Sequence, residues 1–241
     1  MKYKKIVKGK FINRPNRFIA NVKTGEKTTT AHVKNTGRLG ELLKEGADVF
    51  LEDHVENMGS RKHRYSLVGV TKPSAKEDRL VNIDSQAPNK VVKEALEDGR
   101  LLPCGVKKIS YVKAEYMYGE SRLDFYAECD GGARLLMEVK GVTLEENGTA
   151  MFPDAPTERG IRHIEELIHA VEEGYRACIV FVIQMKGVAA FEPNDAAHPQ
   201  FGEALAKAAS MGVEVLAYDC VVDETWMRLD EPVGVTLRKH F

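Results

Sequence analysis

Two short segments, Ser121–Phe125 and Met137–Gly141, alternate polar and apolar residues with the two-residue period of a β-strand. Glu138 and Lys140 must then share one strand face, and Asp124 projects from the polar face of the other segment. If the two strands pair in register, two carboxylates and one ammonium converge on one polar spot. These groups suit the binding of a divalent cation and the activation of water against a phosphodiester.

The acid-x-Lys pattern is short, so its context matters. Glu138-Val139-Lys140 is the only such tripeptide in the chain, and it ends a predicted strand. A solvated strand edge with a cross-strand salt bridge is the competing interpretation. The predicted two-residue turn at Gly119-Glu120 places Glu115 opposite Asp124. Facing carboxylates repel unless a cation or proton intervenes, so Glu115 is a candidate third acid, with Glu94 as an alternative.

Composition describes an ordinary soluble globular protein. The 241 residues are 43% apolar and 29% charged, which suits one large domain or two smaller ones. No window has the length of a transmembrane helix, and the lysine-rich start lacks the apolar core of a signal peptide. The four cysteines show no Cys-x-x-Cys spacing. We therefore expect reduced cysteines, a cytoplasmic location and no membrane association.

The charge is distributed unevenly along the chain. Residues 1–80 carry 18 Lys and Arg against 9 Asp and Glu, whereas residues 81–241 carry 17 against 27. A basic module joined to an acidic one suggests that the first module holds a polyanion. Two merely solvated surfaces are the competing interpretation.

The first eighty residues alternate short strand candidates with turn signals. A brief helical insertion is expected near Leu39–Leu43. This pattern fits a small OB-like β-barrel, whose curved sheet commonly carries nucleic acid. The five expected strands are Lys5–Ile12, Arg17–Val22, Thr28–Val33, Ala47–Glu52 and Tyr65–Thr71.

The remaining residues predict a mixed sheet covered by helices, in the order α-β-β-β-α-β-α-β. Helix signals are a proline at the start, apolar residues at helical spacing and a glycine stop, as at Gly99 and Gly174. Ala177–Ile183 is a nearly continuous apolar run, typical of a strand buried on both faces. The expected helices begin at Pro88, Thr157 and residue 199, and the other expected strands are 109–117, 121–129, 133–140 and Val213–Tyr218.

Several longer motifs resemble those of the bacterial and archaeal sugar fermentation stimulation protein A family. The resemblance covers most of the chain and is weak only after Trp226. The motifs that carry it are His32–Gly37, Tyr118–Phe125, Glu138–Leu144, Phe152–His163 and Gly212–Tyr218.

The resemblance implies an OB-like nucleic-acid-binding barrel at 1–80 and a restriction-endonuclease-like core of the PD-(D/E)xK type at 81–241. Asp124 matches the motif's aspartate, Glu138 its second acid and Lys140 its lysine. The usual proline before the aspartate is replaced by Leu123. The literal pair at Pro153-Asp154 follows the Glu-x-Lys strand and is not the motif.

The expected roles follow. Asp124 and Glu138 would hold Mg²⁺ or Mn²⁺, Lys140 would orient water, and Glu115 would assist as a third acid or as a neighbour of the ligands. Gln184 is a further candidate for the site. Candidate contacts to the nucleic-acid backbone are Arg122, Arg159 and His163 in the core, and Arg14, Arg17, Lys34, Asn35, Arg38, Arg61, Lys62, His63 and Arg64 on the barrel. For each of them, plain surface solvation is the alternative.

Two functions from different classes remain. The first is a metal-dependent nuclease that hydrolyses DNA, with RNA as a second candidate substrate. The second is a non-catalytic DNA-binding regulator of sugar catabolism genes that retains a nuclease fold. A small-molecule enzyme gains no support, because the chain has neither a phosphate-cradling glycine loop nor a nucleophile elbow. The sequence leaves the oligomeric state open.

Overall fold

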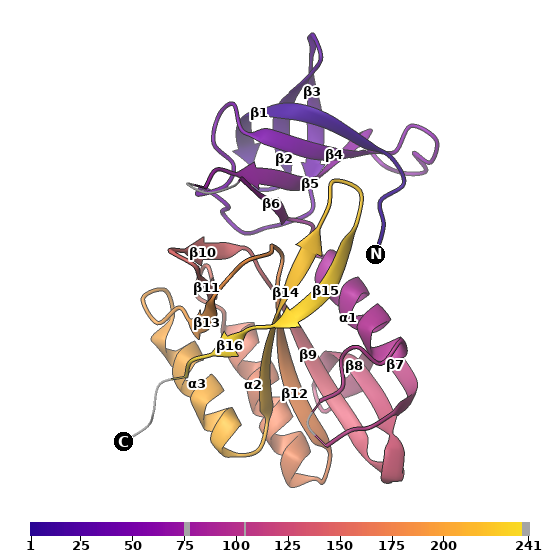
Figure 1. Ribbon diagram of the computed structural model, residues 1–241, viewed down its shortest axis with the longest axis vertical. Helices are drawn as coiled ribbons and strands as arrows, with labels where there is room; N and C mark the ends of the chain where they lie inside the picture. Colours follow the sequence, from indigo (N-terminus) through magenta and orange to yellow (C-terminus); the bar gives the residue numbers. More distant parts are fainter. Residues whose placement is uncertain (75–77, 104, 238–241) are drawn as a thin grey trace. The chain divides into compact units, whose positions relative to one another are not determined.

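The computed structural model describes residues 1–74, 78–103 and 105–237. They form a mixed α/β protein of two compact units, each described separately below (Figure 1). The first unit comprises Met1–Ala87 together with Gln184–Lys186 and Cys220–Arg228. The second comprises Pro88–Ile183, Gly187–Asp219 and the residues from Leu229 onward.

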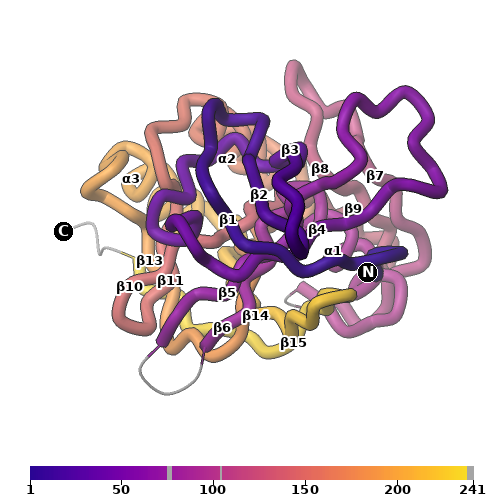
Figure 2. The backbone as a smooth tube through the Cα atoms, turned by 90° about the horizontal axis from the view of Figure 1, so that it is seen from above, coloured from indigo at the N-terminus to yellow at the C-terminus, as the bar shows by residue number. Residues whose placement is uncertain are grey.

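The first unit is built on a closed β-barrel, drawn in indigo and purple in Figure 2. Its strands are ordered β3-β2-β1-β4-β5-β6, and a parallel pairing of β3 with β5 closes the ring. The barrel strands are β1 (Ile6–Asn16), β2 (Ile19–Thr24), β3 (Lys27–Val33), β4 (Asp48–Asp53), β5 (Tyr65–Lys72) and β6 (Arg79–Asn82).

Alternating burial explains why these segments form a barrel. Ala20 and Val22 on β2 are fully buried, whereas Lys23 on the same strand is exposed. Gly9 allows β1 to bend against its neighbour, because a Cβ there would lie 2.9 Å from the carbonyl oxygen of Lys23. The helical insertion expected near Leu39–Leu43 is wrong. The chain makes a single turn there, in which the Leu43 amide donates to the Leu39 carbonyl at 2.8 Å.

The second unit contains a six-stranded mixed sheet in the order β15-β14-β12-β9-β8-β7. Strands β7, β8 and β9 pair antiparallel, while β9, β12 and β14 run parallel, as the buried apolar run of β12 predicts. These strands are β7 (Ile109–Tyr118), β8 (Ser121–Cys129), β9 (Arg134–Val142), β12 (Arg176–Ile183), β14 (Glu214–Val222) and β15 (Met227–Pro232).

Three α-helices accompany this sheet: α1 (Ala87–Glu97), α2 (Glu158–Glu172) and α3 (Pro199–Ser210). Helix α2 packs on β9 and β12 and against α3 (Figure 1). The Thr157 hydroxyl caps α2 by accepting from the Gly160 amide at 3.1 Å, and Gly174 follows its end with a φ of 86°. Both helix boundaries were indicated by the sequence.

Sequence patterns did not identify the shorter elements. These are a 3₁₀ turn (Asp130–Gly132) and a small sheet of β10 (Leu144–Glu146), β11 (Thr149–Phe152), β13 (Ala190–Pro193) and β16 (Gly234–Val235). Segments of two to four residues are too short to show a period.

Two expectations concerned reduced cysteines and the lack of a membrane-spanning helix. Cys129 and Cys178 are buried free thiols and Cys220 is also buried, whereas Cys104 lies outside the described residues. Among the helices in the described ranges, none combines the length and apolar character needed to cross a membrane.

Candidate active site

The register of two neighbouring strands sets the candidate site. In the β8–β9 ladder, Phe125 pairs with Met137 and Tyr126 with Leu136. Continuing this register by one residue sets Asp124 opposite Glu138. The apolar partners Phe125 and Met137 are buried, at 2% and 0% exposure. The acids therefore sit at one place on the sheet because the hydrophobic alternation fixes the pairing.

Glu138 is the most tightly held group of the site, at 3% exposure. Its Oε1 accepts from Lys140 Nζ at 2.6 Å and from His163 Nδ1 at 2.5 Å. Burial alone would raise the pKa of this carboxyl, but the hydrogen bond from His163 and the Lys140 ammonium outweigh it and lower the pKa. Glu138 is therefore a carboxylate. Its Oε2 is buried and has no hydrogen-bond partner among the described residues.

Asp124 is held by two donors. Its Oδ1 accepts from Asn89 Nδ2 at 2.6 Å, and its Oδ2 accepts from the Val139 amide at 2.8 Å. Burial and then the negative charge of Glu138 raise the pKa of Asp124, against the effect of the two hydrogen bonds. A cation bound between the two acids would offset the effect of the Glu138 charge on Asp124. Asn89, near the start of α1, was missed because an amide there carries no sequence signal of its own.

Helix α2 supplies the histidine. His163 is buried, and Arg159 Nε lies 3.4 Å from its Nε2. With Arg159 donating to Nε2, the hydrogen on Nδ1 is directed to Glu138. The expected common face of Arg159 and His163 is present, but His163 contacts Glu138 instead of lying free for a phosphate. Arg159 remains exposed.

Three other candidates lie elsewhere. Glu115 has a φ of 53° and a side chain 70% exposed, and its carboxylate lies 3.5 Å from Arg122. Its described contact therefore joins it to Arg122 and not to Asp124. Glu94 is exposed on α1. Gln184 belongs to the first unit, where its amide donates to Asn82 Oδ1 and to the Asp84 carbonyl.

On the barrel, several candidate phosphate contacts are used inside the fold. The Arg14 guanidinium donates to four backbone carbonyls, those of Arg17, Asn35, Gly37 and Arg38, at 2.5–3.1 Å. The Asn35 side chain accepts from the Gly37 amide at 2.8 Å. These contacts fix a turn. The expectation that Arg14 and Asn35 face a phosphate is replaced by this structural role.

Lys34 and Arg64 also have internal partners. Lys34 Nζ lies 3.1 Å from Asp84 and 3.4 Å from Glu52, and its side chain is only 15% exposed. Arg64 donates through Nε and a terminal nitrogen to both oxygens of Asp53, at 2.7 and 2.8 Å. Two of the barrel's predicted cations are thus largely neutralised by buried carboxylates.

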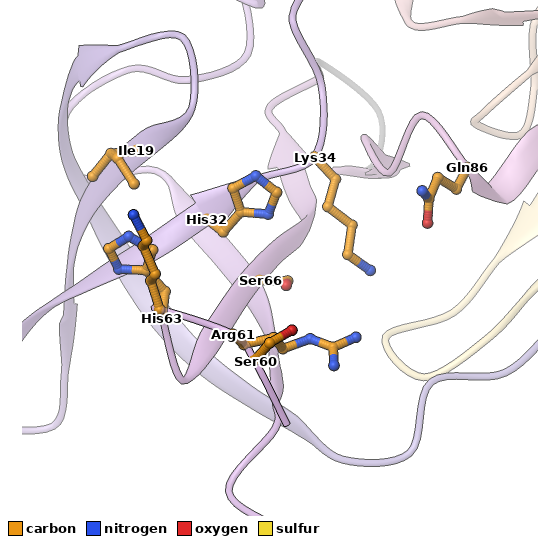
Figure 3. A pocket seen from close by; sticks show the side chains of 9 residues that line it. Ile19, His32, Lys34, Ser60, Arg61, His63, Ser66 and Gln86 are labelled. Carbon is orange, nitrogen blue, oxygen red and sulfur yellow. The ribbon is translucent and has the colours of Figure 1, made fainter. Parts of the chain in front are cut away.

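Like Arg64, four further candidate cations of the barrel are exposed: Arg17, Arg38, Arg61 and Lys62. The Arg17 guanidinium lies over the Phe18 ring, 4.9 Å from its centroid. Arg61, Lys62 and His63 line a pocket of about 630 Å³ on the barrel (Figure 3). No described residue forms a side-chain hydrogen bond or ion pair with Arg61 or Lys62.

Comparison with known proteins identifies the family of the chain. Residues 86–226 match the model described as the sugar fermentation stimulation protein RE domain, and residues 12–83 match that of the SfsA N-terminal OB domain. The chain belongs to the sugar fermentation stimulation protein family. This confirms the predicted family, and with it the fold class of an N-terminal OB barrel followed by a sheet-rich α/β core.

Relatives extend over the whole length of the chain. The sugar fermentation stimulation protein homolog of Ruminiclostridium cellulolyticum is 50% identical over 98% of this chain and 100% of its own. That of Clostridium beijerinckii is 48% identical with the same coverage. The SfsA of Pyrococcus furiosus, solved in complex with Ca²⁺, is 31% identical with a TM-score of 0.84, covering 98% of both chains.

The donor set of this family member fits a hard divalent cation. Among the described residues no group of three or more His, Cys, Asp or Glu side chains gathers as a metal cage. Magnesium-type ions, however, are commonly held by one or two carboxylates together with waters and substrate phosphates. Asp124 and the unpartnered Oε2 of Glu138 meet that need.

Proposed function

We propose that the protein is a divalent-metal-dependent nuclease that hydrolyses phosphodiester bonds. The observation that carries this proposal is the buried, unpartnered Oε2 of Glu138 at the register position facing Asp124. A buried carboxylate oxygen without a donor is costly in a purely structural site. It is well suited to a site that takes up a cation.

Mg²⁺ or Mn²⁺ is the proposed ion, held by Asp124 and Glu138. When bound, such an ion lowers the pKa of water and neutralises charge that develops on the phosphate. The Ca²⁺ present with the Pyrococcus furiosus relative supports a preference for oxygen-binding divalent cations. Calcium and magnesium share carboxylate ligands.

The chain's own groups would then divide the work. Lys140, with its ammonium 2.6 Å from Glu138, would orient the attacking water and stabilise negative charge on the phosphate. The water oxygen forms a new bond to phosphorus while the bond to one ester oxygen breaks, and that oxygen leaves and takes a proton. His163 fixes the Glu138 carboxylate, and Asn89 fixes that of Asp124.

The barrel, at about residues 1–80, would hold the nucleic acid, with DNA as the principal substrate and RNA as a second candidate. Exposed Arg17, Arg38, Arg61 and Lys62 supply sequence-independent attraction for a polyanion. The buried free thiols of Cys129 and Cys178 suit a reducing compartment, so we place this activity in the cytoplasm.

The test is a cleavage screen with purified protein and Mg²⁺ or Mn²⁺ on duplex, single-stranded and branched DNA and on RNA. We expect cleavage of at least one substrate. Asp124→Ala should reduce the rate by about three orders of magnitude, because several kcal/mol of charge stabilisation is lost. Binding of the same substrate should survive.

A matched control is Asp130→Ala, which removes an exposed aspartate that follows the same strand. It should cleave at a rate near that of the unaltered protein. Absence of cleavage across the whole panel, combined with retained binding, would favour the non-catalytic DNA-binding regulator instead.

A further inference from the structure

The pocket on the barrel has two chemically different sides. In Figure 3 the Arg61 guanidinium and the Lys34 ammonium lie on one side, Ile19 and the His63 ring lie on the other, and His32 lies between them. All these residues belong to the first unit. The pocket therefore offers cations and flat rings within one recess.

The cationic side is available to an anion. Arg61 and Lys62 are exposed, and the described residues give neither side chain an ion pair or hydrogen bond. Lys34, in contrast, is paired with Asp84 and Glu52. A phosphate entering the pocket on the side of the Arg61 guanidinium would therefore find an uncommitted partner there.

The ring side suits a planar group. Burial lowers the pKa of His32, and the neighbouring His63, Lys34 and Arg61 lower it further, so its ring is neutral at pH 7. His63 Nδ1 lies 3.1 Å from the Thr30 hydroxyl, which orients that ring. Imidazole rings are among the platforms on which unpaired bases stack.

We propose that this pocket binds one unpaired nucleotide of a single-stranded nucleic acid, with its phosphate at Arg61 and its base against His32 and His63, while Lys62 adds positive charge to the same recess. The volume of about 630 Å³ lies within the range of ligand pockets. A base inside a duplex cannot enter such a recess without leaving its stack. The inference rests on the proposed nuclease function and names the form of its substrate.

The test measures binding without cleavage. Fluorescence anisotropy in EDTA compares a labelled 12-nucleotide single strand with a duplex of the same sequence. We expect the single strand to bind at least about tenfold more tightly, because each stacked base adds substantially to affinity. Arg61→Ala/Lys62→Ala should weaken single-strand binding about tenfold and lower the salt slope by roughly 0.7, the value for one lost phosphate contact on a single strand.

The control is Lys23→Ala/Lys27→Ala, which removes the same charge from exposed positions that do not line the pocket. It should change affinity less than the pocket variant. His32→Ala should weaken single-strand binding while leaving duplex binding unchanged. Equal losses for the pocket and control variants, or equal losses for single strand and duplex, would overturn the inference.

A competition arm distinguishes the source of the nucleotide. Free dTMP and inorganic phosphate should displace the strand only at concentrations far above its Kd. Displacement by dTMP near that Kd would assign the pocket to a free nucleotide and overturn the polymer assignment. EDTA separates the binding assay from the cleavage assay. If the protein cleaves nucleic acid but binds single strand and duplex equally, this inference fails and the nuclease proposal stands. If it prefers the single strand but cleaves no substrate, the nuclease proposal fails and the binding site stands.

Discussion

The acidic site of the core and the basic surface of the barrel use charge in opposite ways. In the core, Glu138 is buried and Asp124 is partly buried, their partners orient them, and one oxygen of Glu138 is left without a donor among the described residues. On the barrel, the better buried cations Arg14 and Lys34 are occupied by the fold itself. The cations left for a ligand, such as Arg61, are exposed.

The difference shows which sequence signals carry functional information. Strand register placed the acids, and register follows from the hydrophobic pattern that also builds the sheet. The barrel's excess of Lys and Arg gave only a total charge. How that charge divides between the fold and a ligand depends on carbonyls and carboxylates that lie far away in sequence.

The sharpest test of the core is Glu138→Gln. We expect Mn²⁺ affinity, measured by calorimetry, to fall by about 1000-fold, since the amide removes one of two charged ligands and several kcal/mol with it. Glu128→Gln, an exposed acid on β8, serves as the matched control and should bind Mn²⁺ normally. Equal Mn²⁺ affinity in both variants would show that Glu138 is not a ligand of the ion.

The next effect concerns the positioning of that carboxylate. His163→Ala should reduce Mn²⁺ affinity and cleavage by about 10–100-fold, the usual cost of losing a group that orients a metal ligand. His163→Gln retains a donor and should recover part of the loss. His169→Ala, at an exposed position on the same helix, should have no effect on either quantity. A normal metal affinity in His163→Ala would contradict the positioning role.

On the barrel, Arg14→Ala tests whether a cation serves the fold. We expect the free energy of unfolding to fall by about 1–3 kcal/mol, because four carbonyls lose a shared donor. The salt dependence of nucleic-acid binding should stay unchanged. Arg38→Ala is the control, because Arg14 contacts only the backbone carbonyl of Arg38. Its free energy of unfolding in denaturant should stay unchanged. If the nucleic-acid affinity of Arg14→Ala depended less on salt concentration, the Arg14 guanidinium would contact the nucleic acid.

The smallest effect is pH-dependent. The hydrogen bonds from Arg64 lower the pKa of Asp53 to about 2, so this pair stabilises the fold above the ordinary aspartate pKa and loses that effect as pH falls toward 2. Arg64→Ala should lower Tm by a few degrees at pH 7, because the ion pair with Asp53 is lost. The decrease in Tm should be smaller near pH 2, where Asp53 becomes protonated. Lys10→Ala, from a pair with both side chains exposed, should leave Tm unchanged at either pH.

Much of the fold follows from local patterns. The hairpin turn at Gly119-Glu120 pairs Tyr118 with Ser121, as its two-residue length dictates. Thr157 and Gly174 mark the ends of α2 through hydrogen bonding and backbone conformation, both of which are local effects. The convergence of Asp124 and Glu138 extends the same logic, since alternation alone selects their faces.

What the sequence did not reveal depends on distant partners. Asn89 reaches Asp124 across 35 positions, and His163 reaches Glu138 across 25. Glu115 sits at the expected register, but its left-handed backbone and the neighbouring Arg122 direct it to solvent. An alternating pattern assigns a face but does not report where one residue departs from strand geometry.

The division of the chain into units has a practical consequence for dissecting the protein. The barrel unit includes Gln184–Lys186 and Cys220–Arg228, so the backbone passes from one unit to the other five times. An expressed fragment that stops after the sixth strand would leave the Asn82 amide without the Gln184 carbonyl that accepts from it at 2.9 Å. The proposed binding of nucleic acid by the barrel is therefore best tested in the full-length chain, with Asp124 and Glu138 replaced to prevent the proposed cleavage.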